Sequence, residues 1–76
     1  MSEKLPRITA SEIVKVLEKK GFFLSRQSGS HKIYKNADGK RVTVSYHSGV
    51  IIKPKTLKSI LQDAELKVEE LKELLK

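Results

Sequence analysis

Two histidines, His31 and His47, are the side chains of this sequence best suited to move a proton near neutral pH. Five of the nine acidic residues fall within residues 61–76 and the others are dispersed. The sequence therefore suggests no pair of carboxylates that could act together as the acid and base of a hydrolase. The histidines lie 16 positions apart and have no neighbouring acidic residues, so they are weak evidence for a metal site. Cysteine is absent, which excludes thiolate zinc ligands, disulfides and cysteine nucleophiles. We therefore expect no metal and no cofactor.

The segment 26–35 surrounds His31 with basic and aromatic residues. Basic side chains hold phosphates and aromatic rings stack on unpaired bases, a combination typical of RNA recognition. RNA also carries its own nucleophile, because a ribose 2′-OH that loses its proton can attack the adjacent phosphate. A histidine contributes roughly 10²–10⁴-fold to such a proton transfer, and cations stabilise the charge that develops on phosphorus. The candidate RNA contacts are Arg26, Ser30, Lys32, Tyr34 and Lys35.

Each of these residues also has a structural interpretation. A lone histidine at the start of a strand is more often a surface residue, and a lone tyrosine more often packs in a core. Strand alternation separates His31 and Ile33 from Lys32 and Tyr34, but it does not say which pair faces the core. The residues alone support a small basic RNA-binding domain and only weakly a ribonuclease.

Composition and charge fit this interpretation. The 76 residues suffice for one domain, and 38% of them are hydrophobic. The net charge is +7, with 13 basic and 4 acidic residues (+9) in 1–60 and 3 basic and 5 acidic residues (−2) in 61–76. Such a basic body favours a polyanionic partner. The sequence contains no apolar stretch typical of a secretory signal or a membrane span, so we expect a cytoplasmic protein that does not enter a membrane.

The pattern of the chain predicts the elements that position these residues. A capping box at Thr9 and Glu12 starts a first helix, which Gly21 ends. Three β segments follow, at 22–27, 31–35 and 41–46, with turn signals between them. Apolar residues at helical spacing run from Pro54 to Leu75, as one bent helix or two short ones. The order predicts an α+β fold of two layers, with helices on one face of a three-stranded antiparallel sheet.

Nearly the whole chain resembles the HicA toxin family, the messenger-RNA interferases of type II toxin–antitoxin systems. The likeness is sharpest in residues 26–34, which contain a Gly29-Ser30-His31 strand motif. It extends over Leu5-Pro6, residues 17–22, residues 38–44, His47-Ser48-Gly49, residues 53–57 and residues 59–61. The resemblance implies a fold like the double-stranded-RNA-binding domain and RNA cleavage without a metal. It also implies that His31 is catalytic and that the partner is a HicB antitoxin.

Two positions depart from the family pattern. Ser45-Tyr46 stands where a proline commonly precedes the second histidine, and Glu65 stands where a glycine often ends the second helix. The second departure favours a continuous C-terminal helix. Neither touches His31, so we expect an active, cytoplasmic endoribonuclease that is monomeric without its antitoxin. His47 is a candidate second proton-transfer group. The rival functions are a non-catalytic module that binds double-stranded RNA and a protein-interaction domain.

Overall fold

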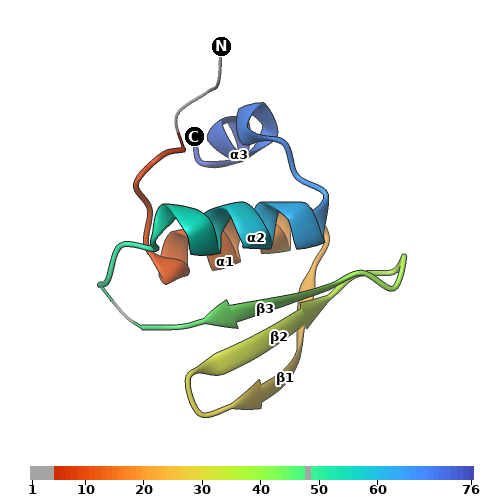
Figure 1. Cartoon of the computed structure of the whole chain (residues 1–76). Helices are drawn as coiled ribbons and strands as arrows, with labels where there is room; N and C mark the ends of the chain where they lie inside the picture. The colour runs from red at the N-terminus through yellow and green to blue at the C-terminus, as the bar shows by residue number, and fades with distance from the viewer. Residues whose placement is uncertain (1–4, 48) are drawn as a thin grey trace.

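The computed structural model describes residues 5–47 and 49–76 of the chain. Its elements are α1 (Ala10–Lys19), β1 (Phe23–Ser28), β2 (His31–Lys35), β3 (Arg41–Ser45), α2 (Pro54–Ala64) and α3 (Val68–Leu74). Figure 1 shows α1 and α2 over one face of the sheet, and α3 on the far side of these helices from the sheet. The predicted α+β fold is confirmed. Among the described residues, no helix is long and apolar enough to cross a bilayer.

Helix α1 begins and ends where the sequence predicts. The Thr9 side chain accepts a hydrogen bond from the Glu12 backbone N–H, and the Glu12 carboxylate accepts one from the Thr9 N–H. At the other end, Gly21 has a φ of 100°, which favours glycine, and the Phe22 N–H donates to the Leu17 carbonyl at 2.9 Å. Both ends of α1 are thus capped by its own sequence.

The sheet is antiparallel, with β2 between β1 and β3. Tyr34 pairs with Val42, and both side chains are buried together with Val44 beneath the helices. Because neighbouring residues of a strand point to opposite faces, His31 and Lys35 belong to the other face. No described element packs on that face, which we call the open face (Figure 1). A bulge between Leu24 and Arg26 shifts the register of β1.

The C-terminal segment forms two short helices, one of the two predicted alternatives, and the continuous helix that Glu65 favoured is wrong. Helix α2 ends at Ala64, and the residue that follows, Glu65, adopts the left-handed conformation with a φ of 54°. That conformation costs a residue with a side chain about 1–2 kcal/mol. The break is offset because the chain reverses and buries Leu66 and Leu71, each worth about 1.5–3 kcal/mol. Sequence pattern alone could not show this, since the leucines acquire their neighbours only when α3 returns to α1.

Polar contacts hold α3 against the end of α1. The Lys19 ammonium donates to the Leu74 carbonyl at 2.8 Å, and Lys20 forms an ion pair with Glu70. The hydrogen bond that the Lys20 ammonium donates to the Glu70 carboxylate lowers the pKa of Glu70 below its usual range. The C-terminal helix therefore covers the side of α1 away from the sheet and leaves the open face free.

Candidate active site

His31 is the first residue of the central strand β2 and is exposed to solvent. Its partner on β3 is Ser45, and its partner on β1 is Ser28. The Tyr46 N–H donates to the Ser30 carbonyl at 2.7 Å, so His31 and Ser45 form the next, non-hydrogen-bonded pair. In such pairs the Cα atoms are typically about 4.5 Å apart and the side chains share a face. His31 thus lies directly beside Ser45, so the expectation that the departure at Ser45-Tyr46 does not touch His31 is wrong.

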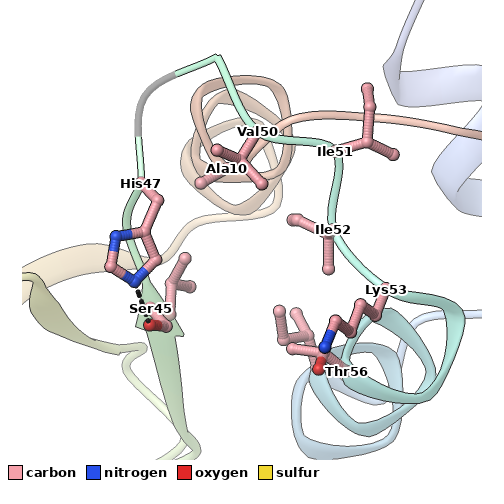
Figure 2. A pocket seen from close by; sticks show the side chains of 10 residues that line it. Ala10, Ser45, His47, Val50, Ile51, Ile52, Lys53 and Thr56 are labelled. Carbon is pink, nitrogen blue, oxygen red and sulfur yellow. Dashed lines mark hydrogen bonds between the residues drawn. The ribbon is translucent and has the colours of Figure 1, made fainter.

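Ser45 also contacts the second histidine. Its hydroxyl lies 3.2 Å from Nε2 of His47, within hydrogen-bond distance (Figure 2). His47 follows the end of β3 by two residues, and its side chain is exposed. The strand register therefore gathers His31, Ser45 and His47 at one end of the sheet. Two imidazoles so placed are the groups that a reaction with one proton removed and one donated requires.

The rest of the open face is basic. Arg26 pairs with Ile33, and Lys35 pairs with Arg41, so these three cations share the face of His31. All three side chains are exposed. None of the three strands contains an aspartate or a glutamate. This face consequently presents a positive potential to any polyanion that approaches it.

The structure separates two predicted residues from this group. Tyr34 is only 2% exposed and faces the helices, where burial, with smaller contributions from Glu18 and Tyr46, raises its pKa. Its ring has no free side for a base, so the predicted base contact is wrong and Tyr34 is a core residue. Lys32 belongs to the same side of β2, and its ammonium lies 3.9 Å from the centroid of the Tyr46 ring.

The remaining predicted contact, Ser30, lies in the turn that precedes β2 and is partly buried. Its carbonyl accepts the hydrogen bond from Tyr46 that joins this turn to the end of β3. Two residues of the site were absent from the sequence-based set, Arg41 and Ser45. The alternation of residues 41–46 already placed them on one face; what was missing was the register that sets them opposite Lys35 and His31.

The site offers no evident place for a metal ion. Among the described residues, no three histidine, cysteine, aspartate or glutamate side chains lie close enough together to hold one. The groups that the site does offer are imidazoles, a hydroxyl and cations. Their chemistry is proton transfer and the binding of negative charge.

A comparison with protein families places this arrangement in context. The family model described as the HicA toxin of bacterial toxin–antitoxin systems matches residues 10–66, three quarters of the chain. The match spans α1 to the end of α2 and includes both histidines, whereas α3 lies outside it. No curated protein matches the chain in sequence. With its fold, its pair of histidines and this match over most of its length, the chain belongs to the HicA toxin family.

Proposed function

We propose that this protein is a metal-independent endoribonuclease that cleaves messenger RNA with His31 as its catalytic base or acid. Membership of the family makes the chain the toxin of a toxin–antitoxin system with a cognate antitoxin. The observation that carries the proposal is the position of His31, exposed on a basic sheet face beside Ser45 and His47. No other group of described residues combines proton-transfer side chains with so much positive charge.

The reaction uses the nucleophile of the RNA. His31 takes the proton of a ribose 2′-OH, and the 2′-oxygen attacks the adjacent phosphorus. The bond from phosphorus to the 5′-oxygen then breaks, and that oxygen leaves with a proton from His47. The products are a 2′,3′-cyclic phosphate and a free 5′-hydroxyl. Proton transfer by one positioned histidine supplies roughly 10²–10⁴-fold.

The neighbouring residues have supporting roles. Arg26, Lys35 and Arg41 bind phosphates of the RNA and stabilise the charge on the pentacoordinate phosphorus. Ser45 is a positioning residue, because its hydroxyl contacts Nε2 of His47. Lys32 stacks on Tyr46 and adds to the positive potential at the end of the strand without lying on the open face.

The proposal includes the setting in which the toxin acts. Its substrate, messenger RNA, lies in the cytoplasm, and the free toxin acts as a monomer. The cognate antitoxin, of the HicB type, inhibits it by covering the open face and the two histidines. An antitoxin bound there would exclude RNA without any change in the toxin's fold.

The test compares purified wild-type protein with His31→Ala on a defined messenger RNA in the presence of EDTA. Glu69→Gln, at an exposed position of α3, is the control for purification, and circular dichroism checks the fold of each variant. We expect cleavage by wild type and control, and a loss of at least about a hundredfold in His31→Ala. Equal cleavage by the folded His31→Ala protein would contradict the proposal.

The rival functions give different results in the same experiment. A non-catalytic module would leave the RNA intact but bind it, and the logarithm of its affinity would fall linearly with log salt. A protein-interaction domain would neither cleave RNA nor bind it at physiological salt.

A further inference from the structure

A pocket of about 280 Å³ lies at the end of the sheet, beside the residues of the proposed reaction. It lies between the end of β3, the loop 49–53 and the first turn of α2 (Figure 2). Its volume is near the lower end of the roughly 300–1,000 Å³ of sites for drug-sized molecules, which suits one ring system. We propose that this pocket receives a nucleobase of the RNA, from the nucleotide next to the cleaved phosphate.

The walls of the pocket are apolar, as the faces of a base require. Val44 and Ile60 are buried side chains that line it, and Val50 and Ile51 line it beside the loop. Val50 is 58% exposed and Ile51 47% exposed, which is unusual for large apolar residues. The Ile52 N–H donates to the Ile8 carbonyl at 2.8 Å, so the loop that bears them is anchored. A base inserted here would cover this apolar surface.

Polar groups stand where the edges of a base would lie. Ser45, His47, Lys53 and Thr56 contribute to the lining around the apolar walls (Figure 2). Thr56 and Lys53 make no side-chain hydrogen bond or ion pair with another described residue. Proteins recognise unpaired bases in this way, by contacts with the faces of the base and hydrogen bonds to its edges.

Charge favours a nucleotide over an uncharged protein side chain as the occupant. Arg7 and Lys53 line an adjoining hollow, and the exposed Lys55 follows in the first turn of α2. That turn contains no acidic residue, and its backbone N–H groups favour negative charge. A base in the pocket would thus place its flanking phosphate among cations, whereas an uncharged side chain would gain nothing from them.

The pocket adjoins the reacting groups. Ser45 and His47 line it, and Ser45 is also the strand partner of His31. A base held there belongs to the nucleotide beside the cleaved bond, so the pocket selects the sequence at which the RNA is cut. This inference rests on the proposed function for its role in cleavage, but base binding itself does not depend on catalysis.

The first experiment measures binding without cleavage. The His31→Ala protein is titrated with each of the four nucleoside 5′-monophosphates, and with ribose 5-phosphate, while backbone amide NMR shifts are recorded. We expect saturable shifts at Val50, Ile51 and Thr56 with at least one nucleotide and not with ribose 5-phosphate. Equal shifts with ribose 5-phosphate would mean an anion site at the helix end and would overturn the base pocket.

The second experiment measures selection. Cut sites in a random RNA pool are sequenced for wild type, Thr56→Val and the matched control Ser59→Ala, which lies outside the pocket on the same helix. Thr56→Val keeps the shape of the side chain but removes its hydroxyl, and we expect the base preference at one position beside the cut to change by about fivefold. Ser59→Ala should keep the wild-type preference.

The two experiments separate the two proposals. Nucleotide-specific shifts without any RNA cleavage by wild type would end the ribonuclease proposal and leave the base pocket standing. Cleavage with no nucleotide shifts and no change in preference would end the base pocket alone. Shifts at the same amides only with the purified antitoxin would identify a protein-binding pocket and would also overturn the inference.

Discussion

Ser45 lies beside both histidines, although it is 14 positions from His31 along the chain. The strand register sets it opposite His31, and its hydroxyl reaches Nε2 of His47 at 3.2 Å. At the scale of single residues, the candidate chemistry therefore depends on Ser45, whose hydroxyl is neither the general acid nor the general base. A positioning residue of this kind acts through the group that it orients.

We predict that His47→Ala reduces single-turnover RNA cleavage at least about tenfold in folded protein, because the leaving oxygen loses its proton donor. Ser45→Ala should lower the rate less, by about two- to tenfold, since His47 stays but loses its hydrogen bond. In the double variant the two effects should not add, because Ser45 acts only through His47. An unchanged rate in His47→Ala would remove this residue from the mechanism.

At the scale of elements, the two ends of α2 contrast. Pro54 occupies the first turn, as its fixed φ favours, whereas Glu65 ends the helix in a conformation that favours glycine. The strained end lets α3 return to α1, where Leu71 is completely buried. Helix α3, which lies outside the family match, completes the core on the side away from the sheet.

We predict that Glu65→Gly is more stable than Glu65→Ala by about 1 kcal/mol, because only glycine adopts the left-handed conformation without steric cost. Both variants lose the exposed ion pair between Glu65 and Lys40, so their comparison isolates the backbone effect. Urea unfolding followed by circular dichroism measures the difference. Equal stability of the two variants would mean that the end of α2 is not strained.

At the scale of the whole molecule, charge is divided between opposite sides. The sheet contributes an open face with Arg26, Lys35 and Arg41, and α3, with its surplus of acidic residues, lies beyond the helices (Figure 1). If RNA is the substrate, as proposed, this polarity would orient it toward the face that bears His31. The C-terminal helix thus leaves the candidate active site unobstructed.

We predict that Arg41→Gln lowers the slope of log affinity against log salt by about 0.7 for single-stranded RNA, the effect of one lost phosphate contact. Lys15→Gln on α1 removes the same charge away from the open face and should leave the slope nearly unchanged. Binding is measured with the His31→Ala protein so that the RNA stays intact. Equal slopes in both variants would place the RNA elsewhere on the molecule.

The sequence by itself determined the features that depend on near neighbours along the chain. The capping box at Thr9, the stop at Gly21, the three strands and the start of α2 at Pro54 were all predicted, because caps, turns and periodicity are local. The excess of basic residues and their concentration around His31 in residues 26–35 were also evident from the sequence. The role of His31 stays a prediction.

Tertiary structure decided everything that depends on which distant segments meet. Ile33 and Tyr34 were equally apolar candidates for the core, and only the packing of α1 and α2 on the Tyr34 side turned His31 and Lys35 outward. The register between β2 and β3 brought Ser45 to His31, and burial of Leu71 against α1 outweighed the preference for an unbroken helix. These outcomes follow from contacts between residues far apart in the sequence, whose energies no local pattern contains.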